Sequence, residues 1–466
     1  MNQLLKKLFA RIIRGAPAAL ALAALWTATA PLNAEAALQG SAGNTVIRNT
    51  ITVNFKDQNG NAQTAVTSTI DITVNTVAAA PTIVSVVTSP GTTDGTGAQV
   101  TYTFRIRTNS NGPGVISFAS ADGTLTNIAA GTAPTTPGNI FLGSTVIDPL
   151  DPMTPVVALA NGSPVTYRVP NDGGLPTDAA VSGGGTGDGV INGLKATDMV
   201  FIYSGAAYYG PFTVTTVTDP AVGAGAVAAY GTLVLTNASG GPLTFTPAYG
   251  WQIVEAKDVT VTVTQGVVTD PTAVASWVTT LTATMGGLST STPTATTNAN
   301  MGKIDIKKYV RNVTTPVVGG GLTATSPLTG ANTFYTTGVN GKPGEILEYL
   351  AVLTDTGRGN STVVYATDLL PTYSTLVTFP ATYGTAPGSA LPGVFALASY
   401  SGTQAILKTD NSGGTANVAY GKSTGTAAGS TMSFNLGNSC TNVFPTGGGS
   451  LSYNQTAYVV YQVKID

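Results

Sequence analysis

Histidine is absent from this chain of 466 residues, and cysteine occurs only once. Without histidine, the sequence lacks the usual proton carrier at neutral pH and the commonest metal ligand in proteins. A single cysteine excludes an intrachain disulfide framework and zinc sites built from several cysteines. Charged residues are also scarce, at 9%, and the formal net charge is −2. This balance offers no positive surface for nucleic acid or for anionic lipid.

Catalytic groups are correspondingly hard to find. A nucleophile needs a general base that works near neutral pH, and that base is most often histidine. No Ser-x-x-Lys spacing occurs in a plausible setting, and Glu345 and Glu348, three apart at the opening of a strand, have a structural interpretation. The sequence therefore predicts a protein that is not an enzyme and that has no cofactor, with calcium as the one cation still to be considered.

What the chain does contain is apolar and β-forming. Hydrophobic residues make up 42% of it, with 56 glycines and 27 prolines between them. The apolar fraction is high enough for real cores, unlike that of a disordered chain. The length exceeds one ordinary domain, so two or three domains are expected.

The first residues have the pattern of an export signal. Basic residues from Lys6 to Arg14 precede a short apolar run at 16–25, and Ala34-Glu35-Ala36 offers a cleavage site between small side chains. This order is typical of a secretory signal peptide, here residues 1–36. No later run has the roughly 20 apolar residues that a spanning helix needs. We therefore expect a secreted protein, extracellular or on the surface of a bacterium, with no transmembrane segment after signal cleavage.

The next segment, residues 37–80, contains a predicted β-hairpin over 44–77. Apolar residues alternate with polar ones on both arms, and Asp57-Gln58-Asn59-Gly60 supplies the turn between them. One arm places four apolar residues on one face: Ile47, Ile51, Val53 and Phe55. The other arm does the same with Val66, Ile70, Ile72 and Val74. This apolar face must be buried, either on the chain's own first domain or against a neighbouring molecule.

The same period of two continues to the end of the chain. It is clear at Val100–Ile106, Val259–Val263 and Val459–Ile465, where threonine and valine dominate because branched side chains fit a pleated surface. We predict an all-β fold of tandem immunoglobulin-like β-sandwiches: a first domain with long loop insertions over 81–300 and a second domain over 301–466. Gly287–Asn300 has the composition of a linker between them, Gly173–Gly189 that of a flexible excursion, and Val317–Thr333 that of a long loop.

Three elements in the second domain carry a family resemblance. Pro343-Gly344-Glu345 opens a strand, Asp355-Thr356-Gly357 forms a turn, and Asp368-Leu369-Leu370-Pro371 follows at similar spacing. In this order they resemble the DUF11, or conserved repeat, domain family of bacterial surface and extracellular proteins, over about residues 301–466. The resemblance implies an immunoglobulin-like sandwich in a cell-envelope setting, and it implies no catalytic activity.

Several residues have both a functional and a structural interpretation. Four aspartates each precede a glycine and are candidate calcium ligands, although Asp-Gly is also what turns require: Asp94, Asp122, Asp172 and Asp188. Lys303, Lys307, Lys308 and Arg311 form a basic group on a strand whose Ile304 and Ile306 point inward, and such charges protect a sheet edge. Cys440 is either a buried thiol or a point of intermolecular cross-linking.

Two functions remain open at this stage. The first is a non-catalytic structural protein, a subunit of an extracellular layer or fibre in which the hairpin completes a neighbour's sheet by β-strand addition. Its partners would be further copies of the chain or other cell-envelope proteins. The alternative is an adhesin or carbohydrate-binding surface module that acts through sandwich loops such as 173–189 and 317–333.

Overall fold

The computed structural model describes residues 43, 46–88, 92–93, 97, 99–147, 157–159, 164–170, 189–219, 230–237, 243–245, 247, 250–378, 393–409 and 418–466. Every regular element in these ranges is a β-strand, which confirms the all-β prediction. The predicted signal peptide, residues 1–36, lies outside them. The described ranges contain no helix of the length and apolar character that crossing a bilayer requires.

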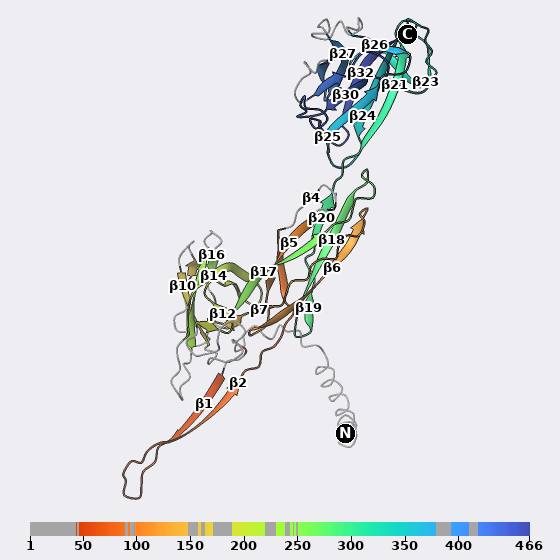
Figure 1. Cartoon of the computed structure of the whole chain (residues 1–466). Helices are drawn as coiled ribbons and strands as arrows, with labels where there is room; N and C mark the ends of the chain where they lie inside the picture. Colours follow the sequence, from red (N-terminus) through yellow and green to blue (C-terminus); the bar gives the residue numbers. More distant parts are fainter. Residues whose placement is uncertain are drawn as a thin grey trace, which may run out of the picture.

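The chain enters the described structure as a hairpin. Strands β1 (Val46–Val53) and β2 (Val66–Thr73) pair antiparallel and form a two-stranded sheet of their own. Figure 1 shows this hairpin extending from one end of an elongated molecule. The long hairpin predicted from the sequence is therefore confirmed.

A first sandwich follows the hairpin. One layer contains β3 (Thr82–Thr88), β5 (Gln99–Arg107) and part of β17 (Gln252–Thr264). The facing sheet has the order β4 (Thr92–Thr93), β20 (Ala295–Ala299), β18 (Ala275–Met285), β6 (Gly114–Thr126) and β7 (Ile140–Leu142), with β19 (Leu288–Thr290) also paired to β18. Burial alternates strictly along β18, and its inward residues join the core between the layers around Trp277, Tyr102 and Phe104.

A stretch of chain inserted within the first sandwich forms a second hydrophobic core of its own. The first half of β17 pairs with β13 (Met199–Tyr203) and β8 (Ser144–Val146), and the second half pairs with β5, so one strand belongs to both cores. The sheet continues from β13 through β14 (Tyr208–Thr218) and β15 (Tyr230–Asn237) to β10 (Pro164–Pro170). Two short pairs complete this lobe: β11 (Val190–Ile191) with β12 (Leu194–Lys195), and β9 (Val157–Leu159) with β16 (Leu243–Phe245).

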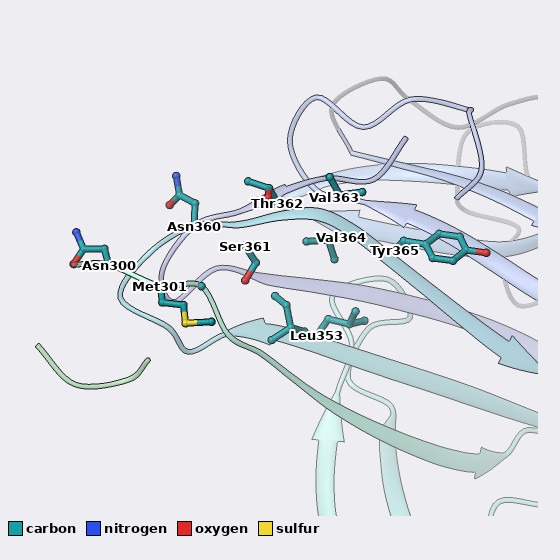
Figure 2. Close-up of a pocket in the computed structure, with 11 residues that line it drawn as sticks. Asn300, Met301, Leu353, Asn360, Ser361, Thr362, Val363, Val364 and Tyr365 are labelled. Carbon is teal, nitrogen blue, oxygen red and sulfur yellow. The ribbon is translucent and has the colours of Figure 1, made fainter. Parts of the chain in front are cut away.

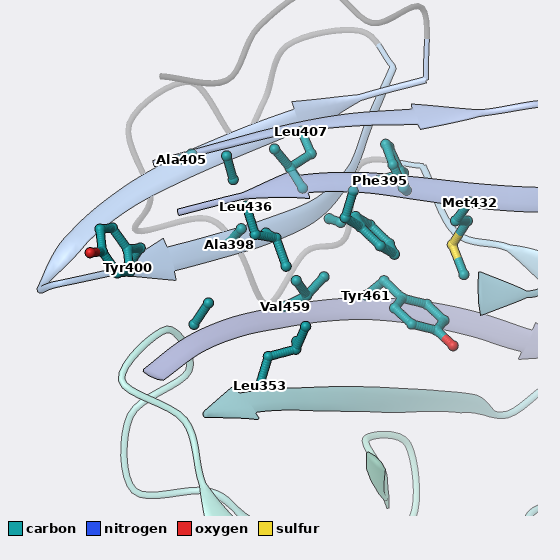
Figure 3. Packing of buried hydrophobic residues seen from close by; sticks show 14 of the residues in the cluster. Leu353, Phe395, Ala398, Tyr400, Ala405, Leu407, Met432, Leu436, Val459 and Tyr461 are labelled. Atoms are coloured by element: carbon teal, nitrogen blue, oxygen red, sulfur yellow. The ribbon is translucent and has the colours of Figure 1, made fainter. Parts of the chain in front are cut away.

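The C-terminal part of the chain forms another sandwich. Its larger sheet has the order β22 (Gly320–Thr325), β23 (Thr333–Thr337), β21 (Ile304–Asn312), β24 (Ile346–Asp355), β32 (Thr456–Ile465), β27 (Val394–Tyr400) and β28 (Thr403–Lys408), and β26 (Ser374–Leu376) pairs with β32. The smaller sheet has the order β29 (Ala419–Ser423), β30 (Thr431–Leu436), β25 (Ser361–Leu369) and β31 (Gly449–Leu451). Figure 3 shows Phe395, Leu407 and Tyr461 among the side chains buried between them.

Backbone hydrogen bonds connect the two sandwiches. The Arg358 N–H donates to the Pro271 carbonyl at 2.8 Å, and the Gly359 N–H donates at 3.0 Å to the carbonyl of Met301, whose side chain packs against the core of the first sandwich. The second sandwich therefore continues the long axis of the molecule, at the end opposite the hairpin (Figure 1).

Two interpretations of loop composition are wrong. Gly287–Asn300, expected to be a linker, forms β19 and β20, and alternate residues of β20 are buried against β18. Val317–Thr333, expected to be a long loop, contains all of β22 and the start of β23. Both segments consist of small and threonine-rich residues, which form strands here because a neighbouring strand pairs with them. The Gly173–Gly189 excursion lies, except for Gly189, outside the described residues.

Candidate functional site: an exposed hairpin and an open sandwich edge

The hairpin has two faces of different character. Register pairs Ile51 with Ser68 and Val53 with Val66, and directly opposite residues share a face. Ile70 and Ile72 lie on the same side as these residues by the alternation of β2. We call Ile51, Val53, Phe55, Val66, Ile70 and Ile72 the apolar face of the hairpin. Ile47 occupies its predicted place in β1, opposite Ile72.

Threonines cover the other face of the hairpin. The hydroxyls of Thr50 and Thr69 lie 3.1 Å apart, and those of Thr52 and Thr67 lie 3.3 Å apart. These cross-strand hydrogen bonds stabilise the hairpin itself without any outside partner. The threonine hydroxyls therefore have hydrogen-bond partners within the hairpin, whereas the apolar side chains on the opposite face have no packing partner in the described structure.

The apolar face is open to solvent. Ile51 is 64% exposed, Ile70 62% and Phe55 48%. No other strand in the described part of the chain pairs with β1 or β2. The hairpin is therefore not packed on the chain's own first domain, which was one of the two possibilities for its apolar residues. An exposed apolar patch of this kind on a soluble protein usually marks an interaction site.

The tip of the hairpin is a well-defined turn. The Asp57 carboxylate accepts hydrogen bonds from the backbone N–H groups of Asn59 at 3.0 Å and Asn61 at 2.8 Å, and Gly60 adopts a positive φ of 79°. These bonds favour the charged carboxylate, chiefly the one from Asn61, and they lower the pKa of Asp57. The turn fixes the register and therefore keeps all the apolar side chains on one face.

The base of the hairpin is anchored to the first sandwich by Asn111. Its side-chain oxygen accepts the Val77 N–H at 2.6 Å, its side-chain amide donates to the Asn75 carbonyl at 3.4 Å, and its backbone carbonyl accepts the Gly43 N–H at 2.7 Å. Asn111 is itself buried. One residue from the loop after β5 thus holds both arms where they leave the body, the β2 arm through its side chain and the β1 arm through its backbone carbonyl, so the body presents the hairpin in a defined direction.

A second unusual surface lies along one side of the C-terminal sandwich. A pocket of about 540 Å³ opens between the first residues of β21 and of β25, and Met301, Ile304, Leu353 and Val364 contribute apolar side chains to it. Figure 2 shows Leu353 and Val364 at its base, with Ser361 beside them. Further along β21, Ile306 is 61% exposed although it stands opposite the buried Leu353 on the core-facing side of the sheet. The prediction that Ile306 points inward gives the correct face, but no neighbour covers the side chain.

The predicted basic group divides into two kinds of residue. Lys308 bonds to the Asp368 carboxylate at 2.7 Å, and Arg311 bonds to the buried Glu348 at 2.6 Å, so these two are structural ion pairs. Lys303 and Lys307 are exposed. Only these two fit the interpretation of a solvated face that protects a sheet edge.

Of the four candidate calcium ligands, only Asp122 lies within the described residues. It sits inside strand β6, opposite Thr279, rather than in the turn that its Asp-Gly pair suggests. Burial raises the pKa of its carboxyl group, and the described residues hold no cluster of three or more cysteine, aspartate or glutamate side chains that could bind a metal ion. Asp94, Asp172 and Asp188 lie outside the described residues, so their role as calcium ligands stays a prediction.

One buried acidic residue was not singled out from the sequence. Glu255 of β17 is 4% exposed and accepts the Gly143 N–H at 2.6 Å where the first sandwich meets the inserted lobe. Burial, with the nearby Asp198 carboxylate, raises its pKa to about 8. The signal was a glutamate among the apolar residues of 253–256, a pattern typical of a strand with both sides covered. Its side chain bonds to a backbone N–H at the junction of two sheets, which gives it a structural role there.

Cys440, the single cysteine, is also buried, at 2% exposure. A disulfide between molecules would require this thiol to reach the surface. The structure therefore favours the interpretation of a buried thiol over that of a cross-linking point.

Comparisons with known proteins give no family. No family model matches the chain, and no curated protein does. Among solved structures, it is similar to the C-terminal domain of the antigen I/II polypeptide BspA of Streptococcus agalactiae, with 8% identity, a TM-score of 0.26, and coverage of 90% of this chain and 91% of that one. The C-terminal domain of the antigen I/II-family protein AspA of Streptococcus pyogenes gives 9% identity and a TM-score of 0.25, covering 90% and 91%. TM-scores of this size do not indicate a common fold.

Proposed function

We propose that this chain is a non-catalytic structural protein of the bacterial cell surface or extracellular space, and that its copies assemble into a layer or fibre by β-strand addition through the hairpin. The observation that carries the proposal is the apolar face of the hairpin, which is exposed along both strands while its base is held by Asn111. The resemblance of residues 301–466 to DUF11 domains and the signal-like residues 1–36 support the surface setting.

The energetics favour burial of this face in a complex. A two-stranded hairpin alone is marginally stable in water. Each fully buried valine, isoleucine or phenylalanine side chain contributes roughly 1.5–3 kcal/mol relative to its exposed state. Burial of six such side chains in a complex therefore provides a driving force for association.

The test compares assembly of the full chain, purified after export, with two double variants of β2. Val66→Lys with Ile70→Lys places two charges on the apolar face. Thr67→Lys with Thr69→Lys places the same two charges on the threonine face of the same strand and serves as the matched control. By negative-stain microscopy and sedimentation, we expect filaments or sheets from the wild type and the control, and dispersed particles from the apolar-face variant.

Two results would contradict the proposal. Assembly that survives charges on the apolar face would show that the hairpin is not the contact. A wild-type protein that forms only separate particles would favour the alternative of an adhesin or carbohydrate-binding module that acts through its loops.

A further inference from the structure

The exposure of Ile306 shows that the C-terminal sandwich is open on one side. Ile306 stands opposite Leu353, which is 3% exposed in the core, so both side chains leave the same face of the larger sheet. The smaller sheet has four strands, and the core between the two sheets includes Leu353 and the partly buried Ile304 but not Ile306. An inward-facing isoleucine at 61% exposure is what a sandwich shows when an edge strand is missing.

The backbone of β21 has a free edge at the same place. β24 pairs with β21 along its whole length, whereas β23 meets it only at Val310, opposite Tyr335. The Lys303 carbonyl accepts the Thr356 N–H from the β24 side. The main-chain N–H and C=O groups of odd-numbered β21 residues therefore point toward β24, and those of even-numbered residues point away from it. The N–H and C=O groups of Ile304, Ile306 and Lys308 therefore face an edge with no strand partner in the described ranges.

The charges nearby do not close this opening. Lys303 and Lys307 leave the opposite face of β21, by the alternation of a strand. Lys308 reaches across to Asp368 and forms the far end of the opening, while the pocket of about 540 Å³ beside Ile304 forms the near end. Between the two ends lie the apolar side chains of Ile304 and Ile306, beside main-chain N–H and C=O groups without a strand partner among the described residues. An added β-strand binds to a surface of this kind.

We propose that this edge is the acceptor for the hairpin of a second copy of the chain, with β2 added parallel to β21 and the apolar face of the hairpin lying over Ile304 and Ile306. This inference rests on the proposed function and adds the site at which the hairpin docks. Two independent features of the fold select β2 and the parallel direction.

The first feature is direction along the molecule. The hairpin and the C-terminal sandwich lie at opposite ends of the long axis, and the hairpin points away from that sandwich (Figure 1). A second copy shifted along this axis therefore brings its hairpin alongside the first copy's C-terminal sandwich. β2 runs from the hairpin tip back to the body, and β21 runs away from the junction between sandwiches, so the two strands are parallel in this arrangement.

The second feature is the hydrogen-bond pattern of the hairpin. The Phe55 carbonyl accepts the Gln63 N–H, and the short hydroxyl contacts mark Thr50–Thr69 and Thr52–Thr67 as the closely spaced pairs. Main-chain groups of Thr67 and Thr69 therefore point outward from the hairpin. In a parallel pair, the main-chain groups of Ile306 would bond to two β2 residues that flank the β2 residue aligned with it. The flanking residues are the outward-pointing threonines, so the aligned residue is Val66, Ser68 or Ile70, and its side chain lies on the same face as that of Ile306. Antiparallel addition of β1 would instead bring threonines to that face.

This arrangement has a consequence for assembly. The donor hairpin and the acceptor edge are different surfaces of one chain, so the contact is head-to-tail. One copy uses its donor and keeps its acceptor, and the other uses its acceptor and keeps its donor. Such a contact builds an open filament along the long axis rather than a closed oligomer.

Cysteine cross-linking tests the docking site directly. The full chain with Ile306→Cys is mixed with copies that carry single cysteines along β2 and is treated with a short bifunctional maleimide; the native Cys440 is buried. We expect copies with Val66→Cys, Ser68→Cys or Ile70→Cys to give at least severalfold more cross-linked dimer than Thr67→Cys or Thr69→Cys. A flat profile along β2, or no cross-linked dimer from any position, would overturn the proposal.

A pair of edge variants separates this inference from the proposed function. Ile306→Lys should reduce the assembled fraction about tenfold or more, because a lysine buried without a partner is strongly unfavourable. Asp305→Lys, on the opposite face of β21, should assemble like the wild type, and both should keep the wild-type melting temperature because both sites are exposed. Filaments that tolerate Ile306→Lys but are lost with Val66→Lys and Ile70→Lys would place the acceptor elsewhere and leave the proposed function standing. Filaments that tolerate the β2 charges would overturn both.

Discussion

At the scale of single residues, Glu348 is a buried acidic group of the second sandwich that depends on its ion pair with Arg311. It is fully buried, accepts hydrogen bonds from Arg311 at 2.6 Å and from Gln462 at 2.8 Å, and so leaves no oxygen unpaired. We expect Glu348→Ala to destabilise this sandwich by about 3–5 kcal/mol, because it leaves the Arg311 guanidinium largely buried without a counterion. Hydrogen exchange of the β24 and β32 amides would measure the loss.

The double variant Arg311→Met with Glu348→Leu provides the control for this prediction. It removes both charges and keeps apolar volume, so it should regain much of the protection that Glu348→Ala loses. Equal loss in the single and double variants would mean that packing, and not the unpaired charge, determines the effect.

Glu255 predicts a dependence of stability on pH. Its pKa is about 8 in the folded protein, against an ordinary value of 4.5, mainly because burial disfavours the charged form. The folded state therefore holds a proton that the unfolded state releases between these values. The contribution of Glu255 to the free energy of unfolding should be fully present below pH 4.5, be lost as the pH rises to about 8, and then level off, with a total change on the order of a few kcal/mol.

Glu255→Gln isolates this contribution. Glutamine can still accept the Gly143 N–H, and it has no proton to lose, so the variant should show a flatter pH profile than the wild type between pH 4.5 and 8. The thermal midpoint measured across this range gives the comparison. An unchanged slope in the variant would assign the pH dependence to another group.

At the scale of elements, the anchoring of the hairpin depends on Asn111. Replacing Asn111 with alanine removes the acceptor of the Val77 N–H, and because this hydrogen bond is only partly buried we expect a local cost of about 1 kcal/mol. Asn111→Asp keeps an acceptor oxygen for that N–H and should lose less. Faster hydrogen exchange at Val77 in the alanine variant, with less change in the aspartate variant, would confirm the anchor, whereas equal rates in all three proteins would argue against it.

Elements with strong alternation could be predicted from the sequence, and the others could not. The two arms of the hairpin and its Asp57–Gly60 turn follow from period-two patterning and from turn-forming residues. β19 and β20 were misread as a linker because alanine, threonine and asparagine carry almost no hydrophobic contrast, although Ala295 and Ala299 are buried. The open edge at Ile306 was equally hidden. Alternation gives the face of a side chain, but whether an opposing strand reaches it depends on long-range pairing.

At the scale of the whole molecule, the proposed contact is apolar and hydrogen-bonded rather than ionic, which predicts how filaments respond to solvent. Salt near 1 M reduces the Debye length to about 3 Å and screens exposed charges, so it should leave assembly largely unchanged. Sulfate should strengthen assembly and cooling should weaken it, because burial of apolar surface responds to both in this way. Sedimentation across salt type and temperature would measure this response. Filaments that dissolve in sodium chloride would instead indicate a contact between charged faces, such as one that uses Lys303 and Lys307.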